Sequence, residues 1–428
     1  MAKFTENRWT SAIIPALLIH IPIGTVYCWS VFKQLIADRL NASPASVEWG
    51  FSLAIFFLGM SAAFAGPMVE KNIKKSALVS MVCFVVGFAG TGVSIALGFL
   101  PGVFICYGAI MGIGLGVGYL TPVKNLMLWF SDNKGLATGI AVAGFGLAKA
   151  IASPLMEYLI GTVGLVNMFF ILAVIYAVMM FFGFLLIKRP ADWVYDPATS
   201  HVSRAEILRK PVFWGIWIAF YINITCGLAL ISQEKDILHD VLKAFPQYAG
   251  LSPAKFAAAI AGIIGLVLAV ASVFNTAGRV GFSTLSDHLK RRETVYQVIF
   301  IMSIAVCLLQ IFTNSINNAL LWAVLAMLFL INAGYGGGFS TLPVLLDQHF
   351  GTKTVSTTHG LALSAWAFAG LSGNQLASFV VTHTPDQAHR YAALILVLTG
   401  LFALALISIS LVKYLGGRNG EGKRSIGA

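Results

Sequence analysis

The chain has 428 residues, 58% of them hydrophobic and only 11% charged, with a mean hydropathy of +0.84 and a net charge of +11. A soluble domain carries about 25% charged residues, so this composition excludes an ordinary soluble protein. Apolar runs of about 20 residues recur along nearly the whole length, and each can cross the ~30 Å of hydrocarbon in a bilayer. The sequence therefore predicts an all-α membrane protein with many spans.

The polar start, MAKFTENRWT, precedes an apolar run without a small-residue cleavage site, so we expect the first helix to be retained. Lysine and arginine concentrate in alternate connecting segments. By the positive-inside rule, both termini are expected in the cytoplasm and the chain in the inner or plasma membrane. The same rule accounts for the net charge without nucleic acid as a partner. Apolar runs and their breakers predict transmembrane helices at 11–35, 46–67, 74–98, 101–129, 135–160, 164–187, 212–233, 256–285, 294–313, 318–346, 357–381 and 389–414.

Three short patterns of the first half return in the second at a spacing of about 220 residues. They are VEKNIKK (69–75) with SDHLKRR (286–292), GVGYLTPV (116–123) with GGGFSTLPV (336–344), and more loosely WFSDNKG (129–135) with HFGTKTV (349–355). We therefore expect two pseudo-symmetric six-helix bundles. The expected bounds are 1–187 and 212–414 for the bundles, 188–211 for a cytoplasmic linker, and 415–428 for a cytoplasmic tail.

Other patterns argue against alternative chemistries. The five cysteines lie within apolar runs and show no metal-binding spacing. The glycine runs GIGLGVG (112–118) and GYGGG (334–338) lack the spacing of a nucleotide loop, and small residues that let helices approach closely explain them. We expect no enzyme activity, no metal and no cofactor. The polar segment 234–255 is expected outside the membrane as a partly helical cap.

Two six-helix repeats with an acid–basic motif after the second and eighth helices resemble the major facilitator superfamily. Four stretches further resemble its oxalate/formate antiporter family: GTVYCWSVF (24–32), WFSDNKGLATGIAVAGFGLA (129–148), EILRKPVFWGIWIAF (206–220) and NTAGRVGFSTLSD (275–287). The resemblance implies a secondary transporter of small carboxylates, related to monocarboxylate carriers, that works by alternating access. We expect a monomer whose partners are its anionic substrate and the lipid bilayer. The loop acids Glu70 and Asp287 are expected to act in gating.

Arg279 interrupts an apolar run about two helical turns before Asp287. Its side chain can snorkel to the headgroups, or its planar fork can bind a carboxylate with two parallel bonds. The resemblance implies the second role, because the helix-8 arginine of the family binds substrate and NTAGR carries it onto Arg279. Lys124, close to the cytoplasmic Lys134, is expected to snorkel.

Lys149 lies about 21 Å along the fifth helix from Gly135, past the midplane and one turn after Phe145. It can line the cavity, pair with Glu157, or reach the outer surface. In the family's oxalate exchanger the resemblance implies a second cation on helix 11, and Trp366 stands at that position here. Lys149, on the pseudo-symmetric fifth helix, is the candidate replacement.

The resemblance also implies an aromatic cage, at Tyr27, Tyr119, Tyr335 and Phe339, although each ring can equally serve helix packing. His20 precedes Tyr27 by about two turns on nearly the same face. Its reference pKa of ~6.5 makes it a candidate proton site, with a hydrogen-bonded core histidine as the alternative. We place no carboxylate in the cavity.

These patterns predict secondary active transport of small organic anions, namely monocarboxylates such as formate, lactate or pyruvate, by anion exchange or proton-linked symport. The alternative substrate is oxalate or another small dicarboxylate exchanged for formate, with Arg279 and Lys149 as the two cations. The rival class is a non-transporting membrane sensor on the same scaffold.

Overall fold

The computed structural model describes residues 7–195, 203–248, 250–313, 318–386 and 389–424, and every regular element within them is a helix. The chain divides into two compact units, unit 1 with Met1–Lys210 and Leu342–Phe368, and unit 2 with Pro211–Thr341 and Ala369–Ala428. The expected bundle, linker and tail bounds stay predictions.

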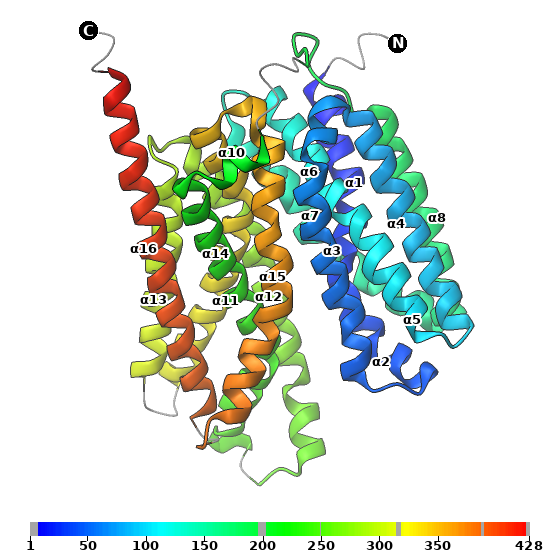
Figure 1. Ribbon diagram of the computed structural model, residues 1–428. Helices are drawn as coiled ribbons and strands as arrows, with labels where there is room; N and C mark the ends of the chain where they lie inside the picture. Colours follow the sequence, from blue (N-terminus) through cyan, green and yellow to red (C-terminus); the bar gives the residue numbers. More distant parts are fainter. Residues whose placement is uncertain (1–6, 196–202, 249, 314–317, 387–388, 425–428) are drawn as a thin grey trace. The chain divides into compact units, whose positions relative to one another are not determined.

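Unit 1 contains a helical bundle in which α3 packs on α6, α4 on α6 and α8, and α1 on α7 and α8 (Figure 1). Its helices are α1 (Ile14–Gly24), α2 (Trp29–Leu40), α3 (Pro44–Lys71), α4 (Ile73–Ala96), α5 (Leu100–Val103), α6 (Gly112–Trp129), α7 (Lys134–Val163), α8 (Leu165–Leu186) and α10 (Arg204–Leu208). A π-helix, η2 (Trp9–Ile13), precedes α1; a 3-10 segment, η3 (Thr25–Cys28), joins α1 to α2; and a second π-helix, η4 (Phe104–Met111), joins α5 to α6.

Unit 2 contains α11 (Pro211–Lys243), α12 (Pro253–Asp287), α13 (Glu293–Phe312) and α16 (Arg390–Arg424), with a short 3-10 turn, η5 (Pro246–Tyr248), between the first two. In it α16 packs on α11 and α13 (Figure 1). Two further helices, α14 (Asn318–Phe350) and α15 (Val355–His383), each contribute one part to either unit, with η6 (Thr352–Thr354) between them.

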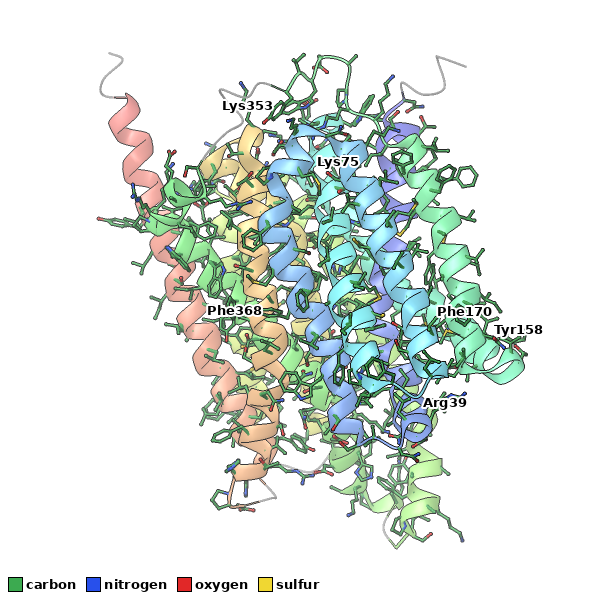
Figure 2. The ribbon with its side chains drawn as sticks, turned by 45° about the vertical axis from the view of Figure 1, so that its right-hand side comes forward. Arg39, Lys75, Tyr158, Phe170, Lys353 and Phe368 are labelled. Carbon is green, nitrogen blue, oxygen red and sulfur yellow. The ribbon has the colours of Figure 1, made fainter. Side chains whose placement is uncertain are left out.

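Eleven of the described helices are long and apolar enough to cross a membrane. The twelfth long helix is α15, whose 29 residues rise by about 43 Å but include many serines, threonines and glycines. Bulky apolar side chains point away from the helices into the surroundings, such as Phe170 of α8, and Tyr158 of α7 is 67% exposed (Figure 2). The predicted all-α membrane fold with twelve long helices is confirmed.

Local sequence signals fix several helix ends. Ser43 caps α3 by accepting from the Ser46 amide at 3.1 Å, with Pro44 at the first helical position. Asn72 caps α4 in the same way, by accepting from the Lys75 amide at 2.9 Å. Asn72 is the single residue between α3 and α4, so the basic cluster after Glu70 lies at a tight helix junction.

The glycine run at the start of α6 serves close helix packing, as expected. A Cβ added at Gly114 would collide with the backbone of Phe84 in α4, and one at Gly116 would collide with the Leu58 carbonyl in α3. Gly114 therefore lets α4 approach α6 closely, and Gly116 does the same for α3, because each backbone occupies the space that a side chain would fill.

Two helix boundaries differ from those predicted. The seventh helix does not end at 233: α11 runs to Lys243, so more than two further turns of the polar segment 234–255 belong to the same continuous helix. The twelfth helix, α16, runs to Arg424 instead of ending near 414. The segment 234–255 was expected as a partly helical cap; neither glycine nor proline interrupts 234–243, so the helix continues through these residues, and a solvated helical face accommodates their charges.

Candidate functional site

Arg279 is almost fully buried in unit 2, with 1% of its surface exposed. Its Nε donates to Oδ1 of Asn275 at 3.0 Å, one turn earlier on α12, and its Cζ lies 5.4 Å from the ring centroid of Phe339 on α14. A snorkelling side chain would expose its head group, so the snorkelling alternative does not describe this geometry. The guanidinium is instead oriented by the amide of Asn275 and by the face of the Phe339 ring.

The rings of Tyr335, Phe339 and Phe220 form a continuous edge-to-face series beside Arg279. Centroids lie 5.2 Å apart for Tyr335 and Phe339, and 5.1 Å apart for Phe339 and Phe220 of α11. Two side-chain hydrogen bonds fix α14 to its neighbours here. Tyr296 of α13 donates to the Gly338 carbonyl of α14 at 2.6 Å, and Ser340 of α14 donates to the Arg279 carbonyl of α12 at 2.6 Å. The structure thus brings together the three unit 2 residues that the sequence predicted: Arg279, Tyr335 and Phe339.

Tyr119 of α6 is the centre of a second aromatic cluster, in unit 1. Its ring is fully buried and lies 5.5 Å from the centroids of His20, Phe145 and Trp366. Tyr27, in η3, packs edge-on against Phe145 at 5.4 Å. The predicted residues Tyr27, Tyr119, Trp366 and His20 therefore share one cluster, built around Tyr119 and Phe145.

His20 ties three helices of unit 1 together. Nδ1 contacts the carbonyl oxygen of Ala141 in α7, and Nε2 lies 3.2 Å from the carbonyl oxygen of Tyr119 in α6. Carbonyl oxygens only accept hydrogen bonds, and a neutral imidazole has a single N–H to donate. A neutral ring can therefore donate to one of the two carbonyls, and which one receives the hydrogen bond depends on the tautomer.

His359 belongs to the same cluster and was missed by the sequence interpretation. It lies on the first turns of α15, is 2% exposed, and its ring centroid is 6.0 Å from that of Tyr119. Within the described residues its Nε2 has no hydrogen-bond partner. The motif THGLALSAW contained the signal, since a histidine about two turns before Trp366 falls on the same helical face.

Lys149 is exposed, whereas Phe145, one turn earlier on α7, is buried. Among the ion pairs of the described residues there is none between Lys149 and Glu157. Its neighbourhood includes Cys28 of η3, which also accepts a hydrogen bond from Ser153 at 3.5 Å. Lys149 therefore lies outside the buried Tyr119 cluster, and its role as a second cation stays a prediction.

Lys124 does not snorkel. Its side chain is 1% exposed and its Nζ lies 3.2 Å from Oε1 of Glu70, which is also 1% exposed. Glu70 further accepts from the backbone amide of Ser356 at 3.0 Å, at the N-terminus of α15, where the helix dipole favours a negative charge. The expectation was wrong because the partner is supplied by another helix, α3, in place of the headgroups.

A second ion pair, between Lys134 and Asp347 at 2.8 Å, lies in the same unit. The other predicted gating acid, Asp287, ends α12 and lies 3.7 Å from Arg292 with a side chain only 5% exposed. Glu70 and Asp287 thus both stand at helix junctions beside basic residues. Their action in gating stays a prediction.

The sequence comparisons agree with this architecture. The profile of the Major Facilitator Superfamily matches residues 18–374. The chain belongs to the major facilitator superfamily. It is a multi-pass membrane protein and, as its relatives are transporters, a transporter and not an enzyme.

Among curated relatives, the chain is 27% identical to the uncharacterized MFS-type transporter YhjX of Escherichia coli, covering 84% of this chain and 85% of the relative. It is 25% identical to the oxalate:formate antiporter of Oxalobacter formigenes, covering 94% and 90%. It is 22% identical to apicoplast pyruvate carrier 1 of Toxoplasma gondii, covering 87% and 82%.

Among solved structures, the superfamily transporter FucP in its outward conformation superposes with a TM-score of 0.68 at 15% identity, covering 94% of this chain and 97% of that one. At this identity the likeness establishes the fold alone.

Proposed function

We propose that this transporter carries small monocarboxylates, such as formate, lactate or pyruvate, by alternating access. The observation that carries the proposal is the buried Arg279, held by Asn275 and the face of Phe339. A guanidinium can bind a small carboxylate with two parallel charge-assisted bonds, which suits it to anion recognition inside a membrane protein. Because the hydrogen bond from Nε to Asn275 fixes the plane of the Arg279 guanidinium, its remaining N–H groups point in a fixed direction.

The relatives support the same class of substrate. The antiporter from Oxalobacter formigenes is named for oxalate and formate, and the Toxoplasma gondii carrier is named for pyruvate. All three anions carry carboxylates on one to three carbons. The buried ring of Phe339 beside Arg279 suits a small, flat molecule, because aromatic edges can approach carboxylate oxygens while excluding water.

Binding by Arg279 alone favours a monocarboxylate over a dicarboxylate. Oxalate or a similar dianion would require a second positive charge, and the exposed position of Lys149 does not supply a buried one. Exchange of oxalate for formate through Arg279 and Lys149 therefore remains the second candidate, with the relative named above in its favour.

Transport can be coupled by exchange of anions or by symport with protons. For symport we propose His20 as a group in unit 1 that holds a proton, because two carbonyl acceptors surround its ring nitrogens.

The test is labelled-substrate counterflow in proteoliposomes that contain the purified protein, with formate, lactate, pyruvate and oxalate as separate substrates. We expect Arg279→Gln to lose monocarboxylate counterflow and Arg279→Lys to recover little, because an ammonium lacks the fork. The exposed Arg209 provides the matched control, and Arg209→Gln should retain transport. Full activity of Arg279→Gln would contradict the proposal.

A further inference from the structure

One side of α4 carries an exposed apolar stripe that ends in a lysine. Leu78, Val82 and Val86 are exposed, and the exposed Lys75 precedes Leu78 by three residues. Spacings of three and four residues place all four side chains on one helical face, and Figure 2 shows Lys75 at the start of the helix. From Val86 to Lys75 the helix rises by about 16 Å, which is roughly half of the ~30 Å hydrocarbon core. The stripe therefore matches the depth of one leaflet, with a cation at the level of the headgroups.

The neighbouring helix α8 shows the same pattern in the opposite direction. Phe181 and Leu185 are exposed four residues apart, and the exposed Lys188 follows Leu185 by three residues. α4 packs on α8, and a Cβ added at Gly92, near the end of α4, would lie 3.0 Å from the Phe169 side chain, near the start of α8. The two helices are therefore antiparallel neighbours, and their terminal lysines lie at the same end of unit 1.

Lys74 joins α4 to α8 at this end. Its Nζ donates to the carbonyl oxygens of Phe184 and Leu185 at 2.7 Å each. These carbonyls belong to the last turn of α8, where carbonyl groups lack partners within the helix. An ammonium has three N–H donors, so one remains for a further acceptor. Lys188 follows Leu185 by three residues, at most about 11 Å of extended chain, and its charge acts on Lys74. Lys74, Lys75 and Lys188 thus form a lysine cluster at the end of the α4–α8 pair.

The lysine cluster takes part in no ion pair among the described residues. Neither α4 nor α8 contains an aspartate or a glutamate. Glu70, the acid nearest to Lys74 in the sequence, is buried and paired with Lys124. The cluster therefore combines an excess of positive charge with the exposed apolar stripes of two membrane-spanning helices.

We propose that the lysine cluster binds the headgroup of an anionic phospholipid, whose acyl chains lie along the exposed stripes of α4 and α8. Phosphate oxygens accept charge-assisted hydrogen bonds from ammonium groups, whereas a zwitterionic headgroup brings a cation of its own. A free phosphate ion has no chains to cover the apolar stripes. The positive-inside rule assigns this end to the cytoplasmic leaflet, which carries anionic lipids. The proposal does not depend on which substrate is transported.

Bound lipid should also stabilise the protein. The like charges of Lys74 and Lys188 repel one another, and a phosphate between them offsets that repulsion. The same phosphate connects the start of α4 with the segment that follows α8, and a ligand that binds only the folded protein stabilises it. We therefore expect anionic lipid to raise the melting temperature of the purified protein.

The test variant is Lys75→Gln/Lys188→Gln. Both side chains are exposed and Lys74 keeps its contacts with α8, so the protein should fold and melt as the wild type does in the absence of lipid. A basic residue near an anionic surface contributes about fivefold in affinity, so the loss of two should weaken binding about 25-fold. Lys75→Arg/Lys188→Arg keeps both charges and should bind within about threefold of the wild type. The control is Lys235→Gln/Lys255→Gln, which removes two exposed lysines from α11 and α12.

The experiment titrates the purified full chain, in a neutral detergent, with phosphatidylglycerol and with phosphatidylcholine of the same dioleoyl chains. Bound lipid is counted by native mass spectrometry, and thermal unfolding is followed in parallel. The wild type and the control should bind phosphatidylglycerol at least about tenfold more tightly than phosphatidylcholine, and Lys75→Gln/Lys188→Gln should lose this preference. The preference should also shrink when salt is raised from about 0.1 to 1 M, because the screening length falls from about 10 to 3 Å.

Equal affinity of the wild type for the two lipids would overturn the proposal. A preference for phosphatidylglycerol that survives in Lys75→Gln/Lys188→Gln would also overturn it, and an equal loss in the control would show that only the net charge matters. Inorganic phosphate that raises the melting temperature as much as phosphatidylglycerol does would assign the cluster to a free anion instead of a lipid. None of these measurements involves transport, so each of these failures would leave the proposed function intact.

Discussion

Glu70 of α3 and Lys124 of α6 form an ion pair, 3.2 Å between Oε1 and Nζ, in which both side chains are 1% exposed. Glu70 also accepts from the amide of Ser356 at the start of α15, and Lys124 donates to the carbonyl of Thr352. One buried pair thus joins three segments of unit 1 that are distant in the sequence.

Removal of one partner should destabilise the protein strongly. Glu70→Gln leaves Lys124 buried without its counter-charge, which typically costs about 3–5 kcal/mol. We expect a clear fall in the apparent melting temperature of the detergent-solubilised protein, and partial recovery in the double variant Glu70→Gln/Lys124→Met. The partly exposed pair of Lys33 and Glu48 is the control: Glu48→Gln should cost only about 0–1 kcal/mol. Equal melting temperatures for Glu70→Gln and wild type would refute this.

Asn275→Asp should impair substrate binding more than Asn275→Ala. The aspartate would place a carboxylate where the amide oxygen now accepts from Nε of Arg279 at 3.0 Å, and so occupy the cation with an internal anion. An increase in KM for counterflow of about 10- to 100-fold, or 1.4 to 2.8 kcal/mol, is expected. Asn275→Ala removes only the orienting bond and should raise KM by about tenfold or less. The reverse order of the two variants would argue against an anion site at Arg279.

Lys149→Ala separates the two substrate classes. If a monocarboxylate is bound by Arg279 alone, the variant should show KM values for pyruvate and formate within about twofold of wild type, since Lys149 is exposed and partly screened. The measurement is competition by unlabelled anions in counterflow. Strong inhibition of the wild type by oxalate that disappears in Lys149→Ala would instead support the two-cation, dicarboxylate alternative.

Two glycines of α12 should respond oppositely to alanine. A Cβ at Gly278 would collide with the backbone of Ala333 in α14, whereas nothing lies within 4 Å of a Cβ at Gly281. Gly278→Ala should cost about 1–3 kcal/mol through overpacking, and it would displace the helix that carries Arg279. Gly281→Ala should be neutral or stabilise by up to about 1 kcal/mol, because alanine favours the helix. Thermal unfolding of the two variants side by side checks the difference.

His20→Gln should destabilise unit 1 and flatten the dependence of net uptake on external pH, because His20 is the proposed proton site for symport. The substitution breaks the bridge between the carbonyls of Ala141 and Tyr119, each bond being worth about 0.5–1.5 kcal/mol. The measurement is net uptake of labelled pyruvate into proteoliposomes at a series of external pH values. A pH profile in His20→Gln equal to that of the wild type would count against His20 as the proton site.

The fold was predictable because the bilayer imposes a strong pattern. Apolar runs of sufficient length, alternating basic loops and repeated motifs each predicted long helices, and those helices are present. Arg279, Tyr335 and Phe339 could be grouped in advance because two short motifs placed them. The residues that were missed depend on contacts between distant segments. Glu234 lies in a charged stretch that suggested a partly helical cap outside the membrane, and only its packing against Asn332 reveals its burial. Lys124 was misjudged for the same reason, since its partner is on another helix.

The 3-10 segment at Thr25–Cys28 changes the rotational phase of the first long helix. A 3-10 turn advances about 120° per residue and an α-helix about 100°, so four residues shift the side chains that follow by about 80°. Before the shift, His20 faces Tyr119 and Phe145; after it, Trp29 and Phe32 face Tyr107, with centroids 4.6 Å and 6.0 Å away. Tyr27 lies inside the shifted stretch and contacts Phe145. A change in the winding of these four residues would therefore rotate Tyr27 relative to the ring that it touches. It would also move the end of the helix along its axis by up to about 2 Å, because the rise per residue is about 2.0 Å in a 3-10 helix and about 1.5 Å in an α-helix.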